Sequence, residues 1–121
     1  MTIRHAVSLE ISEDAHRVDQ AMMRAGIIDP ELTAESILTE FAAKMLAGKS
    51  AAMARHELLV EISYRRKIGH GLAELETIFQ DLGEQIADEI KTFEFEFPSS
   101  ERRWRLDHRD VKMMHLRYDD A

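Results

Sequence analysis

The sequence feature that most constrains the fold is one short alternating stretch near the amino end. Val7, Leu9 and Ile11 are apolar and alternate with small or polar residues, which is the period-two pattern of a half-buried strand. The backbone N–H and C=O groups of a strand need partners. Since the first hundred residues contain no obvious second strand, we expect the neighbour to be the same strand in a second copy of the chain.

The residues that follow have the spacing of helices. Ser12 is in the position of an N-cap for a helix over residues 13–25, and Gly26 is a suitable end. Pro30 or Thr33 would open a second helix that ends at Gly48. A helical pattern returns from about residue 51 to residue 93, with an interruption at residues 69–71, and "TFEFEFPSS" then predicts either a short strand or a frayed helix end.

The apolar residues after the interruption recur every three or four positions, which is typical of a helix bundle or a short coiled coil. We expect most of these helix residues, together with the apolar residues of the strand, to lie at interfaces between subunits. The predicted oligomerisation residues are Val7, Leu9, Ile11, Leu72, Leu75, Phe79, Leu82 and Ile86.

We therefore predict a mainly α-helical protein in three parts. Residues 1–48 would form a dimeric unit of one strand and two helices, and residues 51–98 would form a helical oligomerisation domain. Residues 99–121, which are locally basic and contain the only Trp, are interpreted as a charged tail.

The order strand, helix, turn, helix is that of the ribbon-helix-helix fold, in which a two-stranded ribbon from two subunits enters the DNA major groove. The apolar strand positions would face the shared core, and Thr33 at the start of the second helix would hold a phosphate. The alternate strand positions would face the base edges: Arg4, Ala6, Ser8 and Glu10. Glu10 is unusual there, because it can accept from cytosine but repels phosphate.

The opening "VSLEISEDAH" resembles the TraM family of plasmid conjugation proteins, whose members begin with the pattern V-x-L-x-I-S-x-D-A. In addition, "LTAESILTEF" falls where that family places its second helix. The resemblance implies a ribbon-helix-helix domain followed by a helical tetramerisation domain. It also implies an accessory protein of the relaxosome that binds near a transfer origin, regulates transfer genes and contacts the coupling protein through its C-terminal region.

Composition restricts the other classes of function. The chain of 121 residues has no Cys, which excludes disulfides, thiol nucleophiles and Cys-based zinc sites and fits a reducing compartment. The amino end lacks the apolar core of a signal peptide, and no apolar run is long enough to cross a membrane, so we expect a cytoplasmic protein without a membrane partner. A net charge of −7 counts against non-specific binding to nucleic acid.

Several local patterns contain the residue types of a metal or catalytic site. Glu13 and His16 have the E-x-x-H spacing of di-iron bundles, but a complete site needs a second such pair, so we interpret them as a helix-terminal charge and a surface His. His70 and Glu74 could share a metal or a hydrogen bond, although the flanking glycines favour a turn. Neither a catalytic motif nor a phosphate-binding Gly loop is present. We predict no enzyme activity, no metal and no cofactor.

Two basic stretches remain. "YRRKIGH", residues 64–70, is interpreted as a solvated helix end. The residues around Trp104, from Arg102 to Arg105, could bind nucleic acid or dock the tail onto the acidic bundle.

The leading hypothesis is a homo-oligomeric DNA-binding accessory or regulatory protein, active in plasmid transfer or transcriptional repression, as a dimer or tetramer. The alternative is an acidic, all-helical adaptor or small subunit that binds a larger protein partner through its C-terminal segment and binds no DNA.

Overall fold

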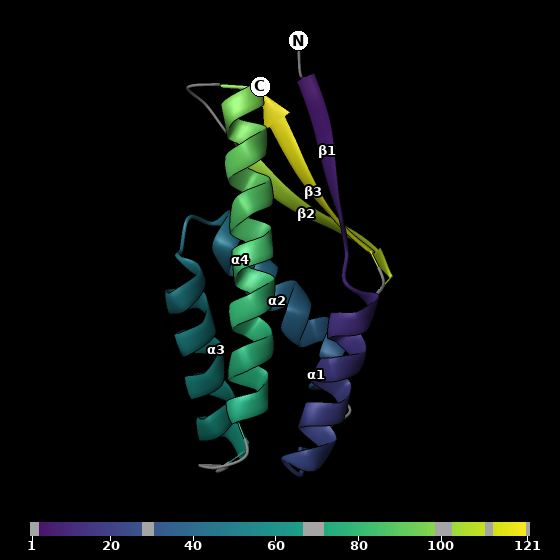
Figure 1. The fold of residues 1–121 in the computed structure, drawn as a ribbon, viewed down its shortest axis with the longest axis vertical. Coiled ribbons are helices and arrows are strands. Elements are labelled where there is room, and N and C mark those ends of the chain that lie inside the picture. Colours follow the sequence, from purple (N-terminus) through teal and green to yellow (C-terminus); the bar gives the residue numbers. More distant parts are fainter. Residues whose placement is uncertain (1–2, 28–30, 67–71, 99–102, 111–112, 121) are drawn as a thin grey trace.

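The computed structural model describes residues 3–27, 31–66, 72–98, 103–110 and 113–120. Four helices form the lower part of the molecule in Figure 1, and three strands lie beside the upper half of the longest helix. In chain order the elements are β1 (Ile3–Glu10), α1 (Ser12–Arg24), α2 (Ala34–Leu46), α3 (Ala51–Arg66), α4 (Ala73–Glu96), β2 (Arg103–Asp110) and β3 (Met113–Asp120).

The three strands form one antiparallel sheet in the order β1-β3-β2. The last strand of the chain is therefore the central one. Its register places Leu116 opposite Val7 of β1 and opposite Leu106 of β2. The first and the last described segments of the chain thus lie side by side, while β1 and β2 form the two edges of the sheet (Figure 1).

This topology corrects the predicted fold class. The partner of β1 is β3 of the same chain, so the ribbon-helix-helix layout, with a strand paired only to its copy in a second subunit, is wrong. The interpretation of the C-terminal residues as a tail fails with it, because residues 103–120 supply both other strands. Their apolar positions do alternate, at Trp104 and Leu106 and again at Met114, Leu116 and Tyr118, but the charged residues between them conceal the pattern.

The helices lie close to where the sequence predicts them. Gly26 and Gly48, the predicted helix ends, have φ values of +76° and +100°, a backbone region that favours glycine. α1 begins one residue early: Ser12 is its first residue, Ile11 occupies the N-cap position, and no side chain caps this end. The stretch from residue 92 to Glu96 forms the C-terminal end of α4, so the alternative of a short strand is wrong.

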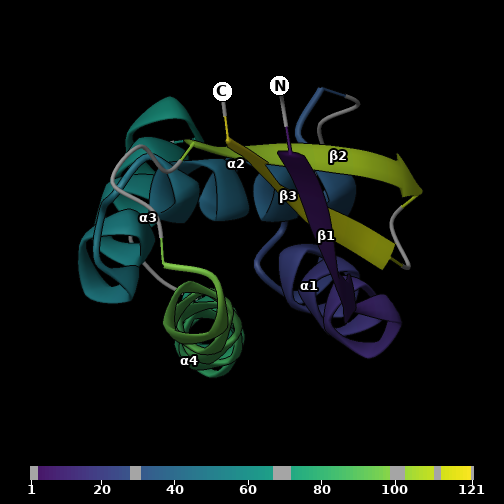
Figure 2. The ribbon, with the colours of Figure 1, turned by 90° about the horizontal axis from the view of Figure 1, so that it is seen from above.

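The core runs through both parts of the molecule. Phe41 of α2 stacks on Phe79 of α4, with ring centroids 5.1 Å apart, at the centre of the helices. At the upper end of α4, Phe93 contacts Trp104 of β2 and Tyr118 of β3, with ring centroids 4.9 and 5.5 Å away. Figure 2 shows α2 running alongside β2 and α1 lying below the end of β1, and the two helices also contact each other. α4 therefore connects the helices to the inner face of the sheet.

The residues expected at subunit interfaces contribute to this internal core. Val7 and Leu72 are half-buried, and the other six are buried within the single chain: Leu9, Ile11, Leu75, Phe79, Leu82 and Ile86. The heptad-like series along α4 thus packs against α1, α2 and α3, and its burial does not require a second subunit.

Candidate functional site

The first candidate surface is the outer face of the sheet, where the predicted DNA-reading strand positions lie. Ala6 and Ser8 are exposed there. Arg4 and Glu10 occupy the same face by register, but their side chains lie outside the described residues. The sequence therefore predicted correctly which face of β1 is exposed, although it assigned the strand to the wrong neighbour.

Charges of opposite sign compensate one another on this outer face. Arg117 donates to Asp107 with an N···O distance of 2.6 Å, and Arg105 forms an ion pair with Asp119. Each pair joins the central strand β3 to the edge strand β2. Because carboxylates neutralise these two guanidinium groups locally, Arg105 and Arg117 are less available to a phosphate than unpaired cations would be.

A row of Ser8, His115 and Asp107 crosses the three strands. Ser8 Oγ lies 3.0 Å from His115 Nδ1, whereas the Asp107 carboxylate is held by Arg117. The row has the residue types of a hydrolytic triad, but its acid is engaged by an arginine and it lies on an open sheet face. We interpret the Ser8–His115 contact as a cross-strand hydrogen bond.

Thr33, the predicted phosphate contact, caps α2. Its Oγ1 accepts from the backbone N–H of Ser36, and the Ser36 hydroxyl accepts from the backbone N–H of Thr33. This reciprocal arrangement is a capping box, which satisfies two donors at the helix start. The groups expected to hold a phosphate are thus partly used within the helix itself.

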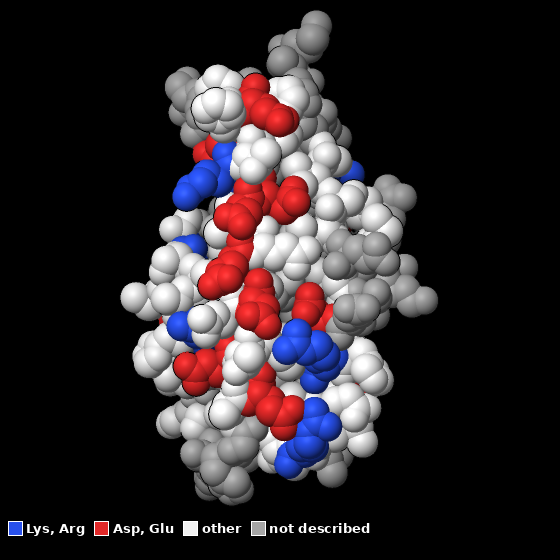
Figure 3. Space-filling view, in the orientation of Figure 1, with Lys and Arg blue, Asp and Glu red and all other residues white. Residues whose placement is uncertain are grey.

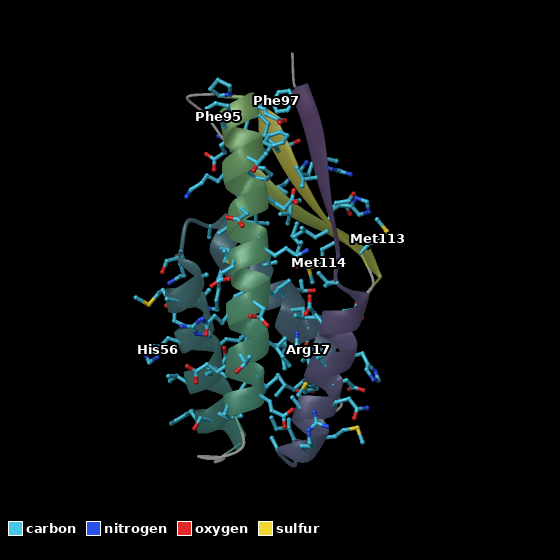
Figure 4. All side chains as sticks on the ribbon, in the orientation of Figure 1. Arg17, His56, Phe95, Phe97, Met113 and Met114 are labelled. Carbon is cyan, nitrogen blue, oxygen red and sulfur yellow. The ribbon has the colours of Figure 1, made fainter. Side chains whose placement is uncertain are left out.

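A second surface, which the sequence patterns did not reveal, is the solvent face of α3. Met53, Val60 and Tyr64 are exposed by 50%, 52% and 85%. At 3.6 residues per turn, these three positions lie within about 40° of one another around the helix axis. They form one line, which we call the α3 stripe. His56, which belongs to the same side of α3, points away from α4 in Figure 4.

The opposite side of α3 packs in the core. Ala54, Leu58 and Ile62 are all buried. α3 is therefore apolar on two opposite faces, and only one of them is covered within the described parts of the chain. The signal was present in the sequence, because the apolar residues of α3 do not fall on a single face, but the burial of each face became known only from the structure.

A third surface is the acidic side of α4. Figure 3 shows Asp and Glu side chains following one another down this helix. The acidic residues of α4 that are exposed are Glu74, Glu76, Asp81, Glu84, Asp88, Glu89 and Glu96. We refer to them as the α4 acidic ridge.

Only part of the acidic ridge is paired with cations of α1. Arg24 donates hydrogen bonds to the Glu74 carboxylate from two nitrogens, with N···O distances of 2.6 and 2.8 Å. Arg17 forms a longer ion pair with Asp81, with an N···O distance of 3.8 Å. The hydrogen bond from Arg24 lowers the pKa of the Glu74 carboxyl below its ordinary value. Glu57 of α3 likewise has a lowered pKa because Lys49 donates to it at 2.7 Å.

The described residues contain no group of three or more His, Cys, Asp or Glu side chains arranged to hold a metal ion. His16 is exposed on α1, and Glu74 is paired with Arg24. The Glu13 side chain and all of His70 lie outside the described residues, as does most of the basic stretch 64–70.

Comparison of the chain with protein-family models, with curated proteins and with solved structures finds no significant match. The resemblance to the TraM family accordingly stays a prediction from the opening residues. None of the described helices has a segment that is both long enough and apolar enough to cross a membrane.

Proposed function

We propose that this chain is a non-catalytic adaptor or small subunit that binds a larger protein through the α3 stripe. The observation that carries the proposal is the alignment of Met53, Val60 and Tyr64 on the solvent side of a helix whose other side is already buried. The proposed binding surface therefore lies on α3, whereas the C-terminal segment supplies two strands of the sheet.

Exposed apolar residues are common when they are scattered singly. A line of three at positions i, i+7 and i+11 is the spacing by which one helix packs against another. Burial of a side chain such as Val60 or Met53 contributes roughly 1.5–3 kcal/mol when it is complete. The α3 stripe therefore offers a second packing seam, with nothing from the described parts of this chain covering it.

The charge on the neighbouring helix, α4, is the basis on which we infer the chemistry of the partner. α3 packs directly against α4, and the acidic ridge follows α4 over its length (Figures 1 and 3). Opposite charges around an interface speed association and disfavour wrong partners. A protein that presents an apolar helix or groove with Lys or Arg along one side would complement both features.

The test is purification of the tagged full chain from its native cells, with mass spectrometry of whatever remains bound in stoichiometric amount. The variant M53Q/V60Q/Y64Q replaces the three apolar side chains of the stripe by glutamine, which is polar and favours helix. The matched control is Met23→Gln, which makes the same kind of change at an exposed Met of α1. We expect the wild type and M23Q to retain the same large protein and the triple variant to lose it. Retention by the triple variant would contradict the proposal.

DNA binding through the outer face of the sheet is a second candidate. It is favoured by Arg105 and Arg117, which face each other on β2 and β3 in the row that contains the exposed Ala6 of β1, and by Arg103, two residues before Arg105 on the same face. Asp107 and Asp119, which pair with Arg117 and Arg105, weaken the case for DNA binding. A gel-shift screen with DNA from upstream of the gene, at low salt, tests it, and an unshifted probe would remove DNA from the candidates.

A further inference from the structure

The two edges of the sheet differ in how they are protected. An edge strand has backbone N–H and C=O groups on one side without a strand neighbour, and proteins commonly blunt such edges with charges, bulges or a covering element. β2 has a register shift between His108 and Asp110, and α2 packs alongside it. Its described outer positions are charged: Arg103, Arg105 and Asp107.

β1 has no bulge, and its charged outer positions, 4 and 10, lie toward its two ends. Its eight residues pair with β3 without a register shift and include no Pro. Its described outer positions are Ala6 and Ser8, which are small, uncharged and exposed. In Figure 1, β1 lies to the right of α4, and it is one of the two edge strands of the sheet. A strand could therefore approach this edge without meeting a bulge or a large side chain at positions 6 and 8.

We propose that the free edge of β1 pairs antiparallel with β1 of a second copy, about a two-fold axis. β1 keeps β3 as its intramolecular neighbour, and the two sheets of three strands join into one continuous sheet. This arrangement differs from a two-stranded ribbon, since each copy is already a complete fold before it pairs.

The register follows from the pattern of β1. Facing residues in a continuous sheet point to the same side, so outer positions must meet outer positions. Pairing Val7 with Val7 of the second copy satisfies this condition and places Ala6 opposite Ser8, a pair of small residues. The same register sets position 4, an arginine in the sequence, opposite position 10, a glutamate. Opposite formal charges thus meet twice, once on each side of the axis, and this self-complementarity is why the occupant is a second copy.

The experiment is sedimentation equilibrium of the full chain over a range of concentrations, with two variants that differ only at residue 8. In A6E/S8E the proposed register sets the two introduced carboxylates opposite each other, twice per dimer. In A6E/S8K it sets the carboxylate introduced at position 6 opposite the ammonium group introduced at position 8. Both variants remove the Ser8 hydroxyl that contacts His115, and circular dichroism checks that both remain folded.

We expect a wild-type dimer, a similar dimer for A6E/S8K, and a dissociation constant roughly tenfold higher for A6E/S8E, given the usual energies of facing charge pairs. A monomeric wild type at all concentrations overturns the proposal, and so do equal dissociation constants for the two folded variants. Because the edge of β1 and the α3 stripe are separate surfaces, either result leaves the adaptor proposal to its own test.

Discussion

Gly83 occupies the point where α4 passes closest to the start of α3. A Cβ atom built at this position would lie 2.8 Å from the Cβ of Ala51 and 3.2 Å from Cζ of Phe41. The first neighbour cannot rotate away, because an alanine Cβ is fixed by the backbone. The close approach of the two helices thus depends on the absence of a side chain at residue 83.

Replacement of Gly83 by Ala should destabilise the protein even though Ala is the better helix former by about 1 kcal/mol. Overpacking a core costs about 1–3 kcal/mol, so we expect a net loss of about 1–2 kcal/mol in the free energy of unfolding, measured with urea. The double variant G83A/A51G removes the clashing Cβ and should recover most of the loss. A stabilised G83A would show that the helices separate freely here.

The pair of Arg24 and Glu74 predicts a pH dependence. The pKa of Glu74 is lowered from its ordinary 4.5 by the hydrogen bond from Arg24, so its contribution to stability is complete above that value and is lost as the pH falls through the lowered pKa. The stability difference between wild type and E74Q should therefore shrink in acid, by urea unfolding at pH 7 and below pH 4.5. Glu76→Gln, an exposed neighbour on α4, is the control. A stability difference between wild type and E74Q that does not change with pH would contradict a stabilising role of the ionised Glu74 carboxylate.

At the scale of the element, α3 has two apolar faces, and we expect substitutions on them to change the free energy of unfolding by different amounts. Ile62→Ala removes a side chain that is buried in the core and should cost about 2–5 kcal/mol. Val60→Ala acts on the exposed stripe and should change the free energy of unfolding by less than about 0.5 kcal/mol in the isolated chain. Urea unfolding of both variants checks this, and a large cost at Val60 would mean that the stripe is covered in solution.

The end of α4 permits a similar comparison. Phe93 joins this helix to Trp104 and Tyr118, whereas Phe95, two residues later, is 87% exposed. Phe93→Ala should cost about 3–5 kcal/mol and shift the emission of Trp104, the only Trp, to longer wavelength. Phe95→Ala should alter neither the stability nor the emission. Equal effects of the two substitutions would contradict the role assigned to Phe93.

The sequence predicted helical elements better than strands, for a physical reason. A helix satisfies its hydrogen bonds locally, so spacing and terminal residues such as Gly26 and Thr33 suffice to locate it. A strand depends on a neighbour that can be anywhere in the chain. The pairing of Leu9 with Met114 joins residues at opposite ends of the sequence, and nothing local to either residue specifies the other.

The candidate site shows the same limit. The outward direction of Ala6 and Ser8 follows from alternation alone, and the structure bears it out. The exposure of the α3 stripe could not be predicted from the sequence. Met53, Val60 and Tyr64 are apolar residues, which could equally have been buried in a core. Only the burial of Leu58 and Ile62 on the other side identifies them as exposed.

At the scale of the whole molecule, the sheet makes the N-terminal part dependent on the C-terminal part. A chain that ends after Pro98 lacks β3, the neighbour of β1, and also β2. Because Leu9 and Val7 would lose the residues opposite them, we expect this truncated chain to aggregate or to show a broad, non-cooperative thermal transition by circular dichroism. A sharp transition near that of the full chain would show that residues 1–98 fold independently.

The position of β3 at the centre of the sheet also governs the timing of folding during synthesis. β1 leaves the ribosome before its neighbour β3, and all four helices and β2 lie between them in the sequence. Until β3 is made, β1 lacks the strand that neighbours it in the folded sheet, and strands with open edges are prone to aggregate when they persist. The three-stranded sheet can therefore form only after β3 has been synthesised.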